Sequence, residues 1–346
     1  MNLEPVLIWA ISALITFSCV WAFSLVSTHL RLTDLPDYRK RHGEEVPLVG
    51  GLAIYVTLIC IVFASSAAGD LVWFIISTSL IVATGAVDDA FGLGPWLRLI
   101  LQVIATFIIL VGAPLTITST GMDFIDGQNI GEWFSLTFTL VAVVGLTNAF
   151  NLSDGIDGLA AGYALVCLIC LILGLYFANG YVEHFGWLMS LVICILTFGM
   201  INLSLTPLKK VFLGDAGSLL IGFVVSWVLI FYSQNSSSIL YPVGALWCVA
   251  LPVFDTVAVI ISRWKSGRSP LLSDRNHLHY LLLDSGMSSH FVLATILGWS
   301  LALGVSGLLI TYLVSPFLSL GLYFGAFILF NVITANLKAA FEGELN

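Results

Sequence analysis

The sequence has 346 residues, of which 59% are hydrophobic and only 9% are charged, and its mean hydropathy is +1.04. This composition excludes soluble and disordered chains and is typical of helical proteins that cross a membrane several times. The net charge of −8 gives no indication of nucleic acid, so membrane lipid is the expected partner and nucleic acid is not.

Apolar runs of about 17 to 25 residues recur along the chain, which is the length that crosses about 30 Å of hydrocarbon as a helix. We predict an all-α fold with about eleven transmembrane helices in a single domain, residues 1–346. The first run has no basic residues before it, so we expect an anchor and no cleaved signal. The predicted spans are 5–27, 48–67, 70–87, 96–113, 134–150, 159–178, 185–204, 217–233, 241–262, 290–313 and 316–336.

The twelve Lys and Arg residues all follow odd-numbered spans, whereas the even-numbered loops contain acids and no base. Cytoplasmic loops retain positive charge during membrane insertion. The amino terminus is therefore expected outside and the carboxyl terminus in the cytoplasm. The six cysteines lie within apolar runs, where they behave as packing residues, so we expect neither a disulfide nor a metal site there.

Short Gly-rich breaks on the basic face contain an unusual share of the acids. Carboxylates are costly near hydrocarbon, so their gathering at helix ends on one face indicates a cation. Asp88 and Asp89 are adjacent, so on a helix they point about 100° apart. The breaks contain Asp88-Asp89, Asn151-Leu-Ser-Asp154-Gly-Ile-Asp157-Gly, Phe212-Leu-Gly-Asp215-Ala-Gly-Ser218, and Asp274 before His277-Leu-His279.

Each break also has a plainer explanation. Asp154 and Asp215 are suitable helix caps, and the Asp pair suits a solvated helix end. His277 and His279 suit either an anion contact or a surface. The bases Arg39-Lys-Arg suit either a lipid phosphate or a purely topogenic role. Asp255 lies inside an apolar run, where both a functional role and a structural hydrogen bond are open.

Mg²⁺ prefers one or two carboxylates together with phosphate oxygens and water. Acids, bases and glycine turns on one membrane face therefore favour phosphoryl transfer between a diphosphate and a lipid, in which catalysis is positioning and charge neutralisation.

In order and spacing, four motifs resemble those of the polyprenyl-phosphate N-acetylhexosamine-1-phosphate transferases, the MraY/WecA superfamily. The resemblance runs from about Leu32 to Gly286 and is greatest to the WecA branch, whose members transfer GlcNAc-1-phosphate from UDP-GlcNAc to undecaprenyl phosphate and release UMP. Two positions depart from it: Tyr280 replaces a His, and Gly92 replaces an Asp found in some members. The motifs are Asp88-Asp89, Asn148-Ala-Phe-Asn151 through Asp154 and Asp157, Phe212 to Ser218, and His277-Leu-His279.

The resemblance implies a Mg²⁺-dependent enzyme, with Mn²⁺ as a substitute, in the bacterial inner (plasma) membrane with a cytoplasmic active site. The reaction would open a cell-surface polysaccharide pathway such as that of the O-antigen, and a homodimer is compatible with it. Phe212 would stack on the uracil. The resemblance places Asp215 and Asp89 at the metal, Asp88, Asp89, Asp154 and Asp157 among the catalytic residues, and Lys40, Asn148, Asn151, Phe212, Arg275, His277 and His279 at the substrates.

Two mechanisms fit this reading: direct attack by the lipid phosphate, with Asp88 accepting its last proton, or transfer through a phospho-aspartate. We favour the direct route because a phosphate is already anionic near neutral pH. Other functions stay open, namely the same reaction with another UDP-N-acetylhexosamine, a proton-coupled transporter that uses Asp255, or an intramembrane prenyltransferase.

Overall fold

The structure is a computed structural model that describes residues 3–34, 45–64, 72–113, 115–122, 131–178, 185–234, 240–269 and 275–344. The chain forms two compact units. Unit 1 comprises Met1–Leu115, Leu140–Asn151 and Val182–Ser226, and unit 2 comprises Thr116–Thr139, Leu152–Tyr181 and Trp227–Asn346.

Helices account for nearly all regular structure in the described residues. They are α1 (Leu3–Val26), α2 (Gly50–Ala64), α3 (Val72–Phe91), α4 (Pro95–Gly112), α6 (Glu132–Ser153), α7 (Leu159–Phe177), α8 (Phe185–Asn202), α9 (Gly214–Gln234), α10 (Pro242–Cys248), α11 (Ala250–Lys265), α12 (Leu278–Asp284), α13 (Ser289–Leu313) and α14 (Pro316–Glu344). Two short strands, β1 (Thr33–Asp34) and β2 (Val46–Pro47), pair antiparallel. The all-α prediction is confirmed.

Each of the eleven predicted spans contains a helix. In the described part of the chain, nine helices are long and apolar enough to cross a membrane, and α2, with 15 residues, is shorter. The span predicted over 241–262 is not one helix, because α10 and α11 meet at an angle of 76°. Pro252 explains this break, since it has no N–H to donate to the carbonyl of Cys248 one turn earlier.

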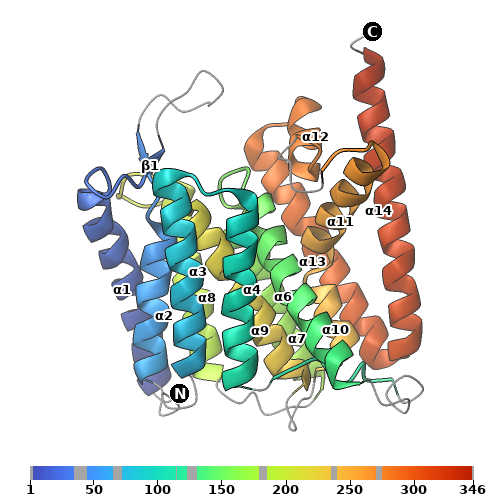
Figure 1. Ribbon diagram of the computed structural model, residues 1–346, viewed down its shortest axis with the longest axis horizontal. Helices are drawn as coiled ribbons and strands as arrows, with labels where there is room; N and C mark the ends of the chain where they lie inside the picture. Colours follow the sequence, from blue (N-terminus) through green and yellow to red (C-terminus); the bar gives the residue numbers. More distant parts are fainter. Residues whose placement is uncertain are drawn as a thin grey trace. The chain divides into compact units, whose positions relative to one another are not determined.

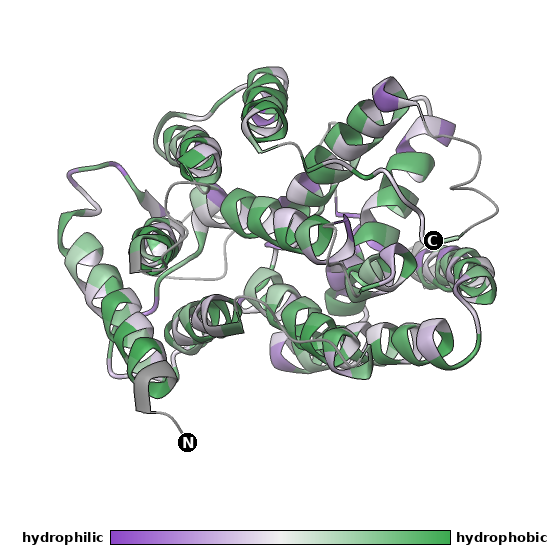
Figure 2. Cartoon of the chain, turned by 90° about the horizontal axis from the view of Figure 1, so that it is seen from below, coloured by the Kyte–Doolittle hydropathy of each residue, from purple (hydrophilic) through white to green (hydrophobic). Residues whose placement is uncertain are grey.

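Large apolar side chains face outward on many helices, and hydrophobic residues, drawn in green, make up much of the long helices in Figure 2. Leu14 is 65% exposed, and Val111 and Ile328 are each 64% exposed. A soluble protein rarely exposes so much contiguous apolar surface. The chain is therefore a multi-pass membrane protein, in which these side chains meet lipid.

In unit 1, polar and aromatic pairs join neighbouring helices. The hydroxyls of Thr16 in α1 and Thr57 in α2 are 3.0 Å apart and buried. The Trp9 ring in α1 packs edge-on against Phe185 in α8, with ring centroids 6.5 Å apart. The β1 and β2 strands lie at the end of this unit where α1 finishes and α2 begins (Figure 1).

The N-terminal part of α9 is buried in unit 1, and glycines let other backbones approach it closely. A Cβ atom on Gly51 of α2 would lie 2.2 Å from the backbone nitrogen of Gly217, and one on Gly85 of α3 would lie 2.3 Å from Cα of Ala216. A Cβ on Gly222 would lie 2.8 Å from Cα of Thr147 in α6. The first turns of α9 are therefore held by three helices at backbone contact distance.

In unit 2, α13 packs against α7 and α10, and α14 covers α10 and α11. The indole N–H of Trp247 in α10 donates to the hydroxyl of Ser319 in α14 at 2.8 Å. Phe254 in α11 packs against Tyr323 and Phe327 of α14, with ring centroids 4.8 and 5.4 Å apart. A cavity of about 440 Å³ is lined by Ala178, Gln234 and Tyr312. None of the predicted site residues lines this cavity.

Candidate active site

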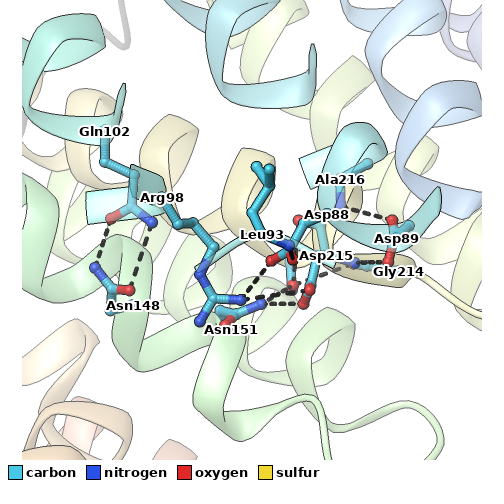
Figure 3. A network of polar contacts seen from close by, with 11 residues as sticks. Asp88, Asp89, Leu93, Arg98, Gln102, Asn148, Asn151, Gly214, Asp215 and Ala216 are labelled. Atoms are coloured by element: carbon cyan, nitrogen blue, oxygen red, sulfur yellow. Dashed lines mark hydrogen bonds and ion pairs between the residues drawn. The ribbon is translucent and has the colours of Figure 1, made fainter. Parts of the chain in front are cut away.

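The two acids at the end of α3, Asp88 and Asp89, contact different partners. Asp88 accepts a hydrogen bond from the backbone N–H of Leu93 and one from the Arg98 guanidinium, both at 2.6 Å. Asp89 points instead to the start of α9, where its two oxygens accept the backbone N–H groups of Asp215 at 2.8 Å and Ala216 at 3.1 Å (Figure 3). The expected divergence of adjacent helical side chains is confirmed.

Asp89 therefore caps α9 from a different helix. The first N–H groups of a helix have no partner within it, and an anion there also interacts favourably with the helix dipole. The N–H groups of Asp215 and Ala216 donate to Asp89, so they are not available to a substrate phosphate. Gly214 has φ of +72°, and a Cβ there would lie 2.6 Å from an Asp89 oxygen.

Asp215 lies in the first turn of α9 and interacts with two further helices of unit 1. Its Oδ1 accepts from the side-chain amide of Asn151 at 2.6 Å, and its Oδ2 lies 3.4 Å from a guanidinium nitrogen of Arg98. Asn151 also donates to the Ser218 hydroxyl at 2.9 Å. The Asp215 side chain is 34% exposed, against 7% for Asp88. Asp215 is thus the more accessible of these two carboxylates.

Arg98 is the functional candidate that sequence reasoning missed, because we used it only to predict topology. It lies in the first turn of α4, after Pro95, and one of its nitrogens contacts both Asp88 and Asp215 (Figure 3). The sequence feature that could have identified Arg98 is its position as a lone base, ten residues after Asp88, in an otherwise apolar segment. Gln102, one turn further on, accepts from the Asn148 amide at 2.5 Å and was also missed.

Phe212 lies at the same end of unit 1. Its N–H donates to the carbonyl of Pro47 at 2.8 Å, and its own carbonyl accepts from Gly50 at 3.0 Å. The ammonium of Lys210 lies 4.9 Å from the centroid of the Phe212 ring. The ring is half-buried. Backbone pairing thus fixes Phe212 just before the turn that carries Asp215.

Residues 154–158 form a turn between α6 and α7, and α7 begins where the predicted span 159–178 begins. α6 continues to Ser153 and α7 begins only at Leu159, with Gly158 at the capping position. Asp154 therefore does not cap α7. Asp154 is exposed and Asp157 is half-buried. These two residues belong to unit 2.

The two predicted histidines are buried in unit 2, and the surface alternative for them is wrong. His277 precedes α12 and is 3% exposed, and His279 lies in α12 and is 1% exposed. A Cβ on Gly155 would lie 2.1 Å from Nε2 of His279. This contact brings the Asp154–Gly158 turn and the His277-Leu-His279 motif together within unit 2.

Burial is the main reason that the pKa of His279 falls to about 4, and the neighbouring His277 and Arg275 lower it further, while Asp255 acts in the opposite direction. A buried charge is costly, so this imidazole is neutral at physiological pH. We had expected the two histidines to offer donors to a phosphate. As a neutral ring, His279 has one N–H to donate and no positive charge to offer a phosphate.

The remaining predicted residues divide between exposed and undescribed positions. Arg275 is exposed, where it forms an ion pair with Asp284 at 2.9 Å and lies 4.8 Å from the Tyr280 ring centroid. Lys40 and its basic neighbours, and Asp274, lie outside the described residues.

The structure thus places the predicted residues in two groups. Unit 1 contains Asp88, Asp89, Asn148, Asn151, Phe212 and Asp215. Within it, Arg98 contacts Asp88 and Asp215, and Gln102 pairs with Asn148 (Figure 3). Unit 2 contains Asp154, Asp157, Arg275, His277 and His279. Among the described residues, no three His, Cys, Asp or Glu side chains gather as a metal cage, and Mg²⁺ bound mainly by phosphate and water does not require one.

These features define an all-α membrane protein with carboxylates, a guanidinium and amides clustered at helix ends. The family follows from comparison with known sequences. The profile of glycosyl transferase family 4 matches residues 71–233. The chain belongs to this family, which confirms the resemblance found in its motifs.

Three relatives share the name undecaprenyl-phosphate alpha-N-acetylglucosaminyl 1-phosphate transferase. The protein of Salmonella typhi is 35% identical over 300 residues, which is 84% of this chain and 81% of the relative. That of Yersinia pestis is 34% identical over 311 residues, covering 88% and 84%. That of Escherichia coli K12 is 36% identical over 281 residues, covering 78% and 75%. Because the chain belongs to this family of transferases, the hypotheses of a transporter and of a prenyltransferase are not supported.

Proposed function

We propose that this protein transfers GlcNAc-1-phosphate from UDP-GlcNAc to undecaprenyl phosphate, giving undecaprenyl-diphosphate-GlcNAc and UMP. The observation that carries the proposal is the cluster around Asp215, which lies in the family motif and joins four segments of unit 1. The shared name of relatives that cover most of the chain supports the choice of substrates.

The residues around Asp215 suit Mg²⁺. Asp215 offers hard oxygen donors and is partly exposed, whereas both oxygens of Asp89 accept backbone N–H groups. We therefore assign the ion first to Asp215, with Asp89 holding Asp215 in place. When bound, Mg²⁺ would neutralise charge on the diphosphate.

The chain's own residues suit the direct route. An oxygen of the lipid phosphate would attack the β-phosphorus of the donor, and the bond to the bridging oxygen would break as UMP leaves. Arg98, close to both Asp88 and Asp215, would stabilise charge on the transferred phosphoryl group. Asp88 would accept the last proton of the attacking phosphate, and Phe212 would stack on the uracil.

Other assignments complete the proposal. Lys40 would meet the lipid phosphate, and Asn148, Asn151, Asp154 and Asp157 would contact the donor. Arg275, His277 and His279 would line the pocket for the sugar. The site would lie on the cytoplasmic side of a bacterial inner membrane, because UDP-sugars are made in the cytoplasm. The product would be used to build a surface polysaccharide.

Purified protein in lipid nanodiscs with undecaprenyl phosphate, radiolabelled UDP-GlcNAc and Mg²⁺ tests the function. We expect label in the lipid fraction and one UMP for each lipid labelled. Transfer from UDP-GalNAc alone would keep the reaction class and reject the sugar, and no transfer from any UDP-N-acetylhexosamine would reject the function.

Two further measurements test the mechanism. Asp215→Asn is expected to lower turnover by at least about 10²-fold, while normal Mg²⁺ dependence in that variant would contradict the metal assignment. Phosphorylated aspartate trapped after incubation with UDP-GlcNAc alone would contradict the direct route.

A further inference from the structure

Asp255 is a buried acid that the proposed mechanism does not use. It lies in α11, is 4% exposed, and contacts the segment that precedes α12 through both carboxylate oxygens. Oδ1 accepts the backbone N–H of Leu278 at 2.8 Å. Oδ2 lies 2.8 Å from Nδ1 of His277. A single carboxylate thus fixes both the backbone and the ring at the start of α12.

The chemistry of these contacts determines how His277 is oriented. A carboxylate oxygen accepts hydrogen bonds, so the contact with Oδ2 favours the tautomer in which Nδ1 of His277 carries the proton and donates it. Nε2 is then the ring nitrogen available for any other partner. It is buried and has no hydrogen-bond partner among the described residues.

A second imidazole nitrogen lies in the same condition. The His279 ring is nearly parallel to that of His277, with an angle of 12° and centroids 5.9 Å apart, and its Nε2 is also buried and unpaired in the described part of unit 2. Buried polar atoms without a partner are rare in folded proteins and require an explanation, of which a functional role is one. The Gly155 backbone lies against Nε2 of His279, so we take Nε2 of His277 as the nitrogen that a polar ligand group meets.

We propose that Asp255 is a positioning residue, which holds His277 through Nδ1 so that Nε2 is presented to the sugar nucleotide. This inference depends on the proposed function and adds to it a residue outside the four family motifs. In this tautomer Nε2 accepts a hydrogen bond, so the ligand chemistry that fits it is a hydroxyl or amide N–H, as found on an N-acetylated sugar.

Asp255→Asn is the sharpest variant, because its shape is nearly unchanged. If the Asn oxygen keeps the contact with Leu278, the amide NH₂ faces Nδ1 of His277. Nδ1 then has to accept a hydrogen bond, so the ring proton moves to Nε2, which becomes a donor. We expect kcat/KM to fall on the order of 10²-fold. The matched control is Val257→Ala, at a half-buried position two residues further along α11. We expect this control to stay within about 2-fold.

A double-mutant comparison separates positioning from general support of the fold. If Asp255 acts through His277, Asp255→Asn should lower activity by less than about 2-fold when it is added to His277→Ala. An equal loss in both backgrounds would overturn the proposal, and so would wild-type activity in Asp255→Asn itself.

A spectroscopic measurement gives an answer that does not require turnover. In protein labelled with ¹⁵N-histidine, the His277 signals, assigned by their loss in His277→Ala, should show protonated Nδ1 in the wild type. A neutral ring protonated only at Nε2 would overturn the proposal. If the wild type transfers no sugar phosphate from any donor, the proposed function fails, while this tautomer still reports on Asp255.

Discussion

At the scale of single residues, Arg98 is the clearest addition to the motif residues. Its guanidinium lies 2.6 Å from Asp88 and 3.4 Å from Asp215, so it balances two acids that would otherwise repel each other. The sequence motifs identify both acids. They do not identify this base, because a lone Arg near a membrane surface is equally well explained by topology.

We predict that Arg98→Ala lowers turnover by about 10² to 10³-fold, because its charge stabilises the transferred phosphoryl group. Arg98→Lys should recover only part of this loss, since Lys lacks the planar fork of Arg. Initial rates at saturating substrates measure the effect. Lys209→Ala, an exposed base at the same end of unit 1, is the control, and an equal loss there would indicate a nonspecific charge effect.

His279 makes the stability of the fold depend on pH. Its pKa is about 4 when folded and 6.5 in the reference state. The unfolded chain therefore binds a proton first as the pH falls, and stability decreases from about pH 6.5 towards 4. Between pH 7.5 and 5 the loss should be on the order of 2 kcal/mol.

Thermal unfolding in nanodiscs at pH 7.5 and 5 measures this loss, with His279→Gln as the comparison. We expect the melting temperature of the wild type to fall more between the two pH values than that of the variant. Equal shifts would show that other groups cause the pH dependence.

At the scale of the elements, close backbone contacts hold the start of α9. A Cβ on Gly85 would lie 2.3 Å from Cα of Ala216, next to Asp215. We predict that Gly85→Ala displaces this turn, lowers the melting temperature by several degrees and reduces turnover at least about 10-fold. Turnover and thermal unfolding should be measured on the same preparation.

Gly145→Ala is the matched control, since it replaces a helical glycine of α6 that has no atom within 4 Å of the added Cβ. Alanine is the better helix former by about 1 kcal/mol, so this variant should be as stable as the wild type or more so. Normal turnover in Gly85→Ala would show that the tight contact does not position Asp215.

The positions of the helices could be predicted from apolar runs, but their ends could not. We expected α3 to stop before Asp88, yet it continues to Phe91, and α9 begins at Gly214, three residues early. A hydropathy pattern treats an acid as a break. In the structure Asp88 and Asp89 are paired with Arg98 and with backbone N–H groups, so the helix accommodates them. Such partners come from distant segments and leave no local signal.

At the scale of the whole molecule, the arrangement of charge leads to a prediction of topology. In unit 1 the described bases follow α1 and α8 or begin α4, at the end that holds the Asp215 cluster. Single cysteines at Lys209 and Val314, in a variant without the six natural cysteines, should react from opposite sides of the membrane. Lys209→Cys should be labelled from the cytoplasm and Val314→Cys from outside.

Labelling of intact cells with a membrane-impermeant maleimide distinguishes the two sides, and permeabilised cells supply the control for reactivity. Lys209 lies between α8 and α9, and Val314 lies between α13 and α14. Both residues are exposed. Labelling of both from the same side would mean that a span between them is missing or re-entrant, and the α10 and α11 break would be the first place to look.

The contact between Gly51 and Gly217 restricts how this protein can evolve. A side chain at either position would collide with the backbone of the other, so neither can change alone without moving the turn that holds Asp215. Adaptation to a new sugar donor therefore has to use positions with room for variation. Arg275, which is exposed in unit 2 and lies outside the turn that holds Asp215, is one such position, and divergence among relatives with different donors should concentrate at positions of this kind.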